Sequence, residues 1–237
     1  MTVGYIFDYG GTLDTRGQHW GQAFWHAYER HCMPITEAQF REAYVHTERT
    51  LGKNPVIRPN FTFHQTLEAK LRLQLEYLEE QCEGVSKYRQ PLLDDLYERT
   101  KAETAHSRKV LETMKERGLP MVLVSNFYGN MPVVLREFGF DGLFLEVIES
   151  AVVGIRKPDP RIFLLGVEAL GLKPEEVTVV GDSLDKDIIP ALKAGCQAVW
   201  LRGEGWNPEP HKRDCPHCET IDSLDELLEM IETKYTI

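Results

Sequence analysis

The chain has 237 residues, and its 27 lysines and arginines against 37 aspartates and glutamates give a formal net charge of −10. With 42% apolar and 27% charged residues, it has the balance of an ordinary globular protein, which excludes collagen, a disordered tail and a coiled coil. The acidic balance argues against a nucleic-acid partner, because phosphate backbones are bound by dense basic patches.

Two features bear on where the protein works. Its 5 cysteines are few for this length, and the stretch before Asp8 lacks the basic start of a secretion signal, so we expect a reducing cytoplasm. The longest uncharged run, over residues 118–135, is interrupted by Pro120, Gly129 and Pro132. We therefore expect no membrane span.

The first predicted element is a buried strand over residues 3–7, which ends at Asp8 and runs into a tight loop at Gly10 and Gly11. From residue 17 to residue 106 the pattern is helical, with a loop predicted over residues 52–59. One example of apolar residues at helical spacing is the series Leu67, Leu71, Leu75 and Leu78.

After residue 106, predicted strands and helices alternate. Short apolar runs predict strands over residues 121–124, 143–148, 177–180 and 198–201. Helical spacing predicts helices over residues 110–117, 132–138, 160–170, 188–194 and 223–233. Such alternation is typical of a parallel sheet with right-handed crossovers. We therefore predict a three-layer, Rossmann-like α/β core of residues 1–16 and 107–237, with an all-helical insertion over residues 17–106.

Ligands bind open parallel sheets beyond the carboxyl ends of the strands. The residues at those positions here are Asp8, Gly10, Gly11 and Thr12, then Ser125 and Asn126, then Lys157, then Asp182, Ser183, Asp185 and Asp187. Clustered carboxylates suit Mg²⁺, whereas a lysine, hydroxyls and loop amides suit a phosphate group. Each piece alone is more often a helix cap or a surface loop, but four pieces in order at four strand ends indicate one site.

In these residues the chain resembles the haloacid dehalogenase-like hydrolase superfamily over nearly its whole length. The run Asp8-Tyr9-Gly10-Gly11-Thr12-Leu13 is similar to the family's nucleophile loop. The later motifs are matched by Ser125, by Lys157, and by Gly181-Asp182-Ser183 with Asp187. The helical insertion is similar to the family's cap, which closes over the site and selects the substrate.

The resemblance implies a role for each residue and a Mg²⁺-dependent phosphatase that acts on small phosphorylated metabolites. Asp8 would attack phosphorus and form an aspartyl-phosphate, and Ser125 and Lys157 would complete the catalytic set. The phosphate would be bound by Thr12, Ser125, Asn126 and Lys157. The Mg²⁺ ion would be held by Asp8, the backbone carbonyl of Gly10, Asp182 and Asp187.

At one position the chain departs from the family's pattern. Phosphatases of the family carry a second Asp two residues after the nucleophile, which protonates the leaving group and then activates water, and here Gly10 takes its place. Loss of a positioned acid/base lowers a rate by about 10²–10⁴. We therefore expect reduced or specialised activity, or a replacement acid, for which the candidates are His19, His26 and Asp14.

Two other functions stay open. Relatives that cleave carbon–halogen or carbon–phosphorus bonds also lack the second Asp. However, the dehalogenases are metal-free and lack the full acidic fourth motif, and the phosphonate-cleaving relatives need a cap lysine, for which Lys53 is the candidate. The other alternative is a non-catalytic phosphate or metabolite sensor, and the intact Asp8, Lys157 and Asp182 argue against it.

Cys215 and Cys218 have the spacing of a redox or zinc motif, with His211 and His217 as further zinc ligands. A redox pair would stand at the start of a helix, where the dipole lowers the pKa of the first thiol. Because this pair lies in a long polar loop, we favour two exposed loop thiols without a function.

Overall fold

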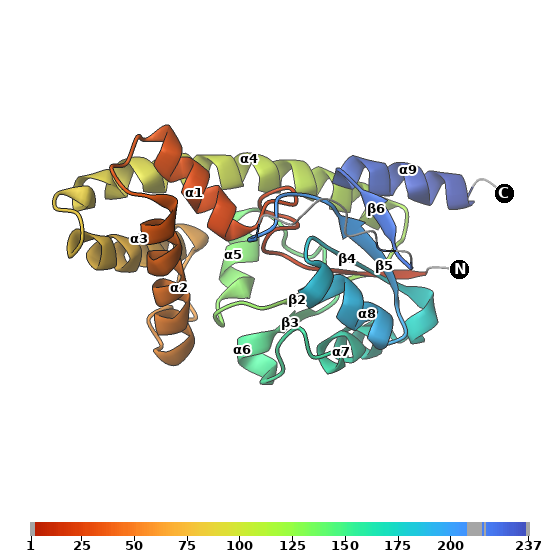
Figure 1. Cartoon of the computed structure of the whole chain (residues 1–237). Coiled ribbons are helices and arrows are strands. Elements are labelled where there is room, and N and C mark those ends of the chain that lie inside the picture. Colours follow the sequence, from red (N-terminus) through yellow and green to blue (C-terminus); the bar gives the residue numbers. More distant parts are fainter. Residues whose placement is uncertain (1–2, 208–214, 216, 236–237) are drawn as a thin grey trace.

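The structure, a computed structural model, describes residues 3–207, 215 and 217–235 (Figure 1). Within these residues, six parallel strands form one sheet in the order β3-β2-β1-β4-β5-β6. The strands are β1 (Gly4–Phe7), β2 (Met121–Ser125), β3 (Val147–Glu149), β4 (Val177–Gly181), β5 (Gln197–Leu201) and β6 (Glu219–Ile221). The central strand, β1, is therefore flanked by the strands that carry the later motifs.

Helices cover both faces of the sheet. They are α5 (Met131–Glu137), α6 (Ser150–Val153), α7 (Arg161–Leu170), α8 (Ile189–Lys193), α9 (Leu224–Tyr235) and the end of α4 (Arg89–Glu116). Because side chains alternate along a strand, Tyr5 and Phe7 pack with α4, α5 and α9, whereas Ile6 packs with α7 and α8. Figure 1 shows α4 and α9 on one side of the sheet and α7 and α8 on the other. The predicted three-layer α/β core is confirmed.

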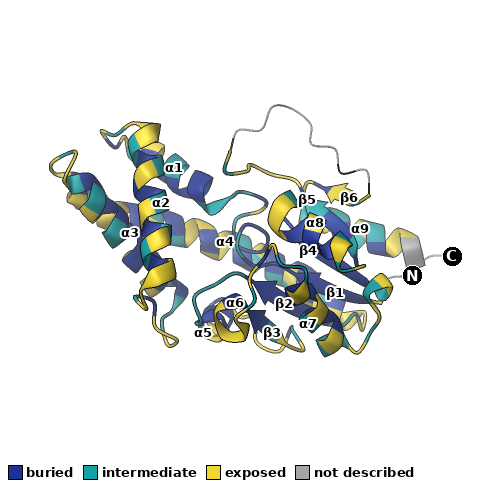
Figure 2. Cartoon of the chain, turned by 60° about the horizontal axis from the view of Figure 1, so that its bottom comes forward, coloured by how far each residue is buried: buried dark blue, intermediate teal, exposed yellow. Residues whose placement is uncertain are grey.

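The residues between β1 and β2 are helical. They form α1 (Trp20–Arg30), α2 (Glu37–Lys53), α3 (Phe63–Glu79) and the start of α4, at one end of the molecule. Thr36 and Thr62 begin α2 and α3 with capping boxes, in which the threonine hydroxyl accepts a hydrogen bond from a backbone N–H of the first turn. Figure 2 shows that α2 exposes an outer stripe, while the strands β1, β2 and β4 are buried.

Helix α4 differs from the prediction, which ended the helical insertion at residue 106 and began a separate helix at residue 110. It is one helix of 28 residues, and it passes through the predicted border between insertion and core at residues 106 and 107. Between the buried apolar residues at its start and at its end, α4 buries the polar residues Thr100, Thr104 and Ser107. A search for apolar residues alone therefore misses that the buried face of the helix is continuous. Neither α4 nor another helix in the described part of the chain is long and apolar enough to cross a membrane.

Two strands also differ from the prediction. Strand β3 occupies only Val147–Glu149, because Leu145 of the predicted apolar run is 63% exposed and lies outside the sheet. Strand β6 has the sequence Glu-Thr-Ile, with only Ile221 buried, and this is too short and polar to show as an apolar run. In addition, α2 continues to Lys53, into the loop predicted over residues 52–59.

Candidate active site

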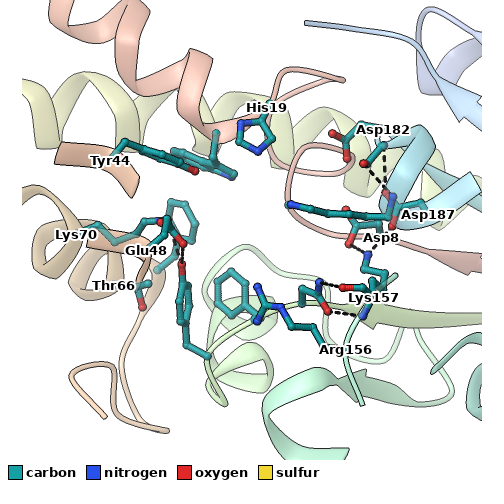
Figure 3. Close-up of a pocket in the computed structure, with 18 of the residues that line it drawn as sticks. Asp8, His19, Tyr44, Glu48, Thr66, Lys70, Arg156, Lys157, Asp182 and Asp187 are labelled. Atoms are coloured by element: carbon teal, nitrogen blue, oxygen red, sulfur yellow. Dashed lines mark hydrogen bonds and ion pairs between the residues drawn. The ribbon is translucent and has the colours of Figure 1, made fainter. Parts of the chain in front are cut away.

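The residues predicted from the strand ends lie together at the carboxyl edge of the sheet. Asp8 follows β1, Asn126 follows β2 and Asp182 follows β4, while Lys157 comes from the loop between α6 and α7. They line a cavity to which the helical insertion also contributes (Figure 3). From the insertion the lining residues are His19, Trp20, Tyr44, Glu48, Phe63, Thr66, Leu67 and Lys70.

Lys157 is the centre of the buried polar network. Its Nζ atom lies 2.5 Å from Asp8 Oδ1 and 2.6 Å from Asp187 Oδ1, and it donates a third hydrogen bond to the Val124 carbonyl oxygen at 3.3 Å. All three N–H groups of the ammonium are thus used. Burial alone lowers the pKa of a lysine, but Asp187 and Asp8 outweigh this and raise the pKa of Lys157. The residue therefore stays charged and fixes the position of Asp8.

Two of the predicted phosphate-binding residues, Thr12 and Asn126, take part in this framework. The Thr12 hydroxyl accepts a hydrogen bond from the Asp182 N–H at 3.1 Å and lies 3.1 Å from Asp182 Oδ1 and 3.4 Å from Asp8 Oδ2. Asn126 lines the cavity, and its side-chain amide exchanges two hydrogen bonds, each of 3.0 Å, with the backbone of Lys157. Ser125 is 2% exposed at the end of β2 and, like Thr12, is not part of the described cavity lining.

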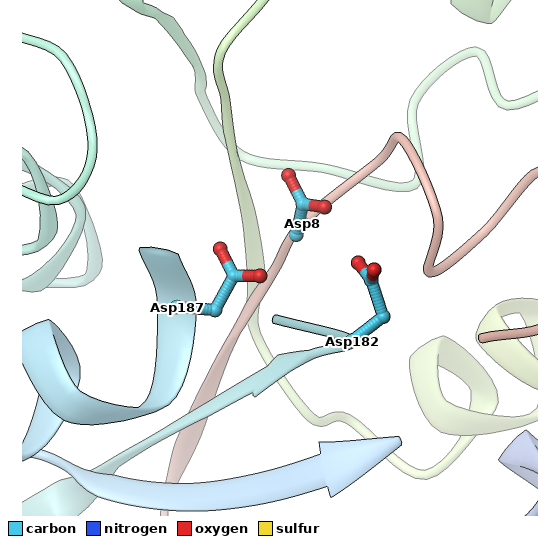
Figure 4. Close-up of side chains that lie close together, drawn as sticks. All are labelled: Asp8, Asp182 and Asp187. Atoms are coloured by element: carbon cyan, nitrogen blue, oxygen red, sulfur yellow. The ribbon is translucent and has the colours of Figure 1, made fainter. Parts of the chain in front are cut away.

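The predicted metal ligands Asp8, Asp182 and Asp187 lie close together (Figure 4). One oxygen from each lies within 4.8 Å of the others. Burial raises the pKa of Asp8 to about 6, against the opposing effect of Lys157. Burial, together with the charges of Asp187 and Asp8, also raises the pKa of Asp182. Three carboxylates held this close in a buried site repel one another, and a hard divalent cation relieves that repulsion, so the donor set fits such an ion.

Gly10 lines the cavity, and the three candidate replacement acids occupy different places. His26 is half-exposed and pairs with Glu29 and Glu204, both at 2.8 Å, away from the lining residues. Asp14 is fully buried and accepts hydrogen bonds from the Gly11 N–H and the Trp20 indole N–H, at 2.7 and 2.8 Å. Burial raises the pKa of Asp14 to about 7, but its oxygens hold the loop rather than face the cavity lining.

His19 does line the cavity, but its ring is poorly suited to donate a proton at neutral pH. Its Nδ1 atom accepts a hydrogen bond from the Gly21 N–H at 3.0 Å, which places the proton of the neutral ring on Nε2. Burial, together with the charges of Lys186 and Lys70, lowers the pKa of His19 to about 4. The ring is therefore neutral at pH 7 and can act in the cavity as a hydrogen-bond donor.

An NMR titration of the imidazole nitrogens tests this assignment. We expect the His19 ring to stay neutral from pH 8 down to a pKa of about 4. We expect His26 to titrate above its ordinary value, since the hydrogen bond with Glu29 raises its pKa. His19→Gln identifies the resonance by its loss. A measured pKa of His19 above 6 would restore this histidine as the replacement acid.

Two sites that the sequence suggested look different in the structure. Lys53 ends α2 as an exposed residue outside the cavity lining, and the lysine that the insertion does contribute is Lys70. Its signal in the sequence is a lysine three residues after Leu67, within the apolar stripe of α3. Cys215 and Cys218 are half-buried and joined by a disulfide bond, and His211 lies outside the described residues.

A parallel α/β fold with an inserted helical layer, and a lysine bridging two buried carboxylates at the sheet edge, define a haloacid dehalogenase-like hydrolase. The sequence model of the haloacid dehalogenase-like hydrolase family matches residues 3–195, and the chain belongs to this family.

Curated relatives of the chain are phosphatases. Over 98 residues it is 41% identical to the glyceraldehyde 3-phosphate phosphatase of Methanopyrus kandleri, and the match covers 41% of this chain and 42% of that protein. Over 103 residues it is 40% identical to the phosphoserine phosphatase of Thermus thermophilus, and the match covers 42% of this chain and 40% of that protein. These matches span less than half of each relative. A longer match, over 202 residues, is 26% identical to the phosphoglycolate phosphatase of Vibrio vulnificus and covers 83% of this chain and 81% of that protein.

Solved structures share the fold over the whole chain. A dehalogenase with an intermediate complex has a TM-score of 0.63 at 20% sequence identity and covers 97% of this chain and 96% of its own. A phosphatase of the same superfamily from Thermococcus onnurineus has a TM-score of 0.54 at 23% identity and covers 98% of each chain. Because the same fold occurs in dehalogenases and phosphatases, the fold does not decide between the two reactions.

Proposed function

We propose that the chain is a Mg²⁺-dependent phosphatase that acts on small phosphorylated metabolites, with activity restricted by the absence of a carboxyl group at Gly10. The observation that carries the proposal is the position of Asp8, held by Lys157 at 2.5 Å in a cavity that also contains Asp182 and Asp187. The phosphatase names of the curated relatives support the reaction class.

In the proposed reaction an oxygen of Asp8 attacks phosphorus, the bond from phosphorus to the ester oxygen breaks, and an aspartyl-phosphate forms. Water then attacks that phosphorus and releases Asp8 and inorganic phosphate. Lys157 keeps Asp8 in place and offsets charge on the phosphoryl oxygens. Because Gly10 has no side chain, the leaving oxygen departs as an anion or takes its proton from water. Substrates with good leaving groups are therefore favoured.

The proposed metal ligands are Asp8, Asp182, Asp187 and the backbone carbonyl of Gly10. When bound, Mg²⁺ offsets the negative charge of the carboxylates and the phosphate. The insertion over residues 17–106 serves as the cap that closes the cavity and selects the substrate. We further propose a cytoplasmic location, with small phosphorylated molecules as the partners.

Turnover of acetyl phosphate and p-nitrophenyl phosphate tests the proposal, because both leaving groups depart with little help from an acid. We expect Mg²⁺-dependent release of phosphate from both, and a loss of at least about 10³-fold in Asp8→Asn, which lacks the nucleophile. Asp94→Asn is the matched control, since Asp94 is an exposed residue of α4 outside the cavity lining. Equal phosphate release with and without Asp8 would refute the phosphatase and favour a non-catalytic binding protein.

A further inference from the structure

The cavity has a polar cluster on the side opposite Asp8 and Lys157, where Figure 3 shows Glu48 and Lys70. The Lys70 ammonium lies 2.7 Å from Glu48 Oε1 and donates a hydrogen bond to the Tyr128 hydroxyl oxygen at 3.2 Å. The Tyr128 hydroxyl in turn donates to Glu48 Oε2 at 2.9 Å. These three residues, which all line the cavity, are called the roof triad below.

The roof triad carries one positive and one negative charge. Burial opposes ionisation of both partners, but Glu48 outweighs it and raises the pKa of Lys70, and Lys70 outweighs it and lowers the pKa of Glu48. His19, which lines the same cavity, is neutral at pH 7. The roof is therefore polar but has no net charge.

The opposite end of the cavity carries charges that balance a phosphate group. Lys157 and the three carboxylates beside it have a net charge of −2, which one divalent cation neutralises. Arg156 and Lys186 are exposed side chains that also line the cavity, and their two positive charges match a phosphate dianion. No surplus positive charge remains in the described lining for a second anionic group.

The groups of the roof triad match the hydrogen-bonding pattern of a hydroxyl group. Lys70 donates one hydrogen bond within the triad, to Tyr128, and its ammonium lies 2.7 Å from Glu48 Oε1, a buried oxygen that accepts no hydrogen bond among the described residues. A donor and an acceptor therefore lie side by side in the cavity lining. A hydroxyl group both donates and accepts hydrogen bonds, so it can accept from Lys70 and donate to Glu48. A carboxylate only accepts, and in this roof it would meet the negative charge of Glu48 as well as lose its hydration.

The volume of the cavity indicates how long a leaving group must be to reach the roof. Its volume is about 150 Å³, the volume of an engineered cavity in another protein that binds benzene. A phosphoryl group fills much of that space, so a short carbon chain is enough to reach from it to the roof.

On the basis of the proposed phosphatase function, we propose that the roof triad selects phosphate esters of short, uncharged compounds with hydroxyl or carbonyl groups. Phosphate esters of hydroxy acids are disfavoured, because their carboxylate would lie at a roof without net positive charge. Glu48 and Lys70 are thus specificity-determining residues, which bind the leaving group and do not take part in phosphoryl transfer.

Binding of two matched esters tests the proposal without turnover. Glycerol 3-phosphate and 3-phosphoglycerate have the same length and differ only in a hydroxymethyl group against a carboxylate at the far end. With the Asp8→Asn protein and Mg²⁺, isothermal titration calorimetry is expected to give a Kd about tenfold lower for glycerol 3-phosphate. If Asp8→Asn has no cooperative thermal melt, Asp8→Ala with Mg²⁺ takes its place.

Variants of the triad test its role in this preference. Glu48→Gln keeps the shape and an acceptor for Tyr128 but leaves the charge of Lys70 uncompensated, so the two Kd values should converge or reverse. The double variant Glu48→Gln/Lys70→Gln has a neutral roof again and should regain the preference. Glu76→Gln, an exposed residue of α3 that pairs with Arg72, is the control and should keep the tenfold difference.

Equal Kd values for the two esters in the parent protein would overturn the proposal, as would binding of neither ester or an unchanged preference in Glu48→Gln. These outcomes are distinct from failure of the phosphatase proposal. Turnover of acetyl phosphate without an ester preference refutes only the substrate class. An ester preference without any turnover leaves the substrate class standing and refutes the phosphatase.

Discussion

Gly10→Asp is expected to raise kcat for phosphate esters with alcohol leaving groups by about 10²–10⁴, because it places an acid two residues after Asp8. The backbone can accept this change. A Cβ atom at Gly10 would meet only the Trp20 side chain, at an ordinary contact distance of 3.8 Å. The measurement is kcat for glycerol 3-phosphate beside the burst rate of aspartyl-phosphate formation from acetyl phosphate, a step that needs no acid and should stay within about threefold.

Gly11 supplies the matched control for this substitution. Its φ is +101°, and a Cβ atom there would lie 2.5 Å from the carboxyl atoms of Asp182. Gly11→Ala is therefore expected to displace Asp182 and to lower turnover of both substrates. If Gly10→Asp folds normally and glycerol 3-phosphate is hydrolysed no faster, the missing carboxyl at position 10 is not what restricts the enzyme.

Lys157→Met is expected to abolish turnover and to lower the free energy of unfolding by about 3–5 kcal/mol. The substitution leaves Asp8 and Asp187 without their shared counter-charge. This is costly because both side chains are less than a tenth exposed, so water cannot replace the lysine. Urea unfolding at neutral pH measures the loss of stability. Because a divalent cation supplies positive charge to the same carboxylates, added Mg²⁺ should restore part of the stability without restoring turnover.

Lys109→Met controls for the loss of a lysine as such, since Lys109 is an exposed residue of α4. It should change the free energy of unfolding by less than about 0.5 kcal/mol. A loss below about 1 kcal/mol in Lys157→Met would mean that the carboxylates lose their charge or reach water when the lysine is absent.

The core and much of the candidate site could be predicted from the sequence, because both depend on local patterns. A strand that ends in an acid and a glycine-rich turn can be found in one stretch of chain, and a parallel sheet brings all such ends to one edge. Asp8, Asp182 and Asp187 are therefore neighbours once the strand order is known. Lys157 is different, because it lies in the loop between α6 and α7, and this loop brings it within hydrogen-bonding distance of both Asp8 and Asp187.

The cap half of the cavity could not be predicted in this way. Glu48, Lys70 and Tyr128 lie on three separate elements, and no spacing in the sequence relates them. Their contact depends on how α2 and α3 pack against each other and on the loop after β2. The same limit explains Thr12 and Ser125. A hydroxyl beside a nucleophile reads as a phosphate ligand, but whether it points into the cavity is decided by packing.

The unbroken course of α4 has a mechanical consequence. A helix of 28 residues is roughly 42 Å long, and this one begins among the helices of the insertion and ends against the sheet and α9. Its far half is fastened to α9 by the pairs His106–Asp225 and Arg117–Glu232. The insertion is thus joined to the core on one side by a continuous helix and not by a flexible linker. Any tilt of the insertion relative to the sheet would therefore require α4 to bend or to shift against the sheet and α9.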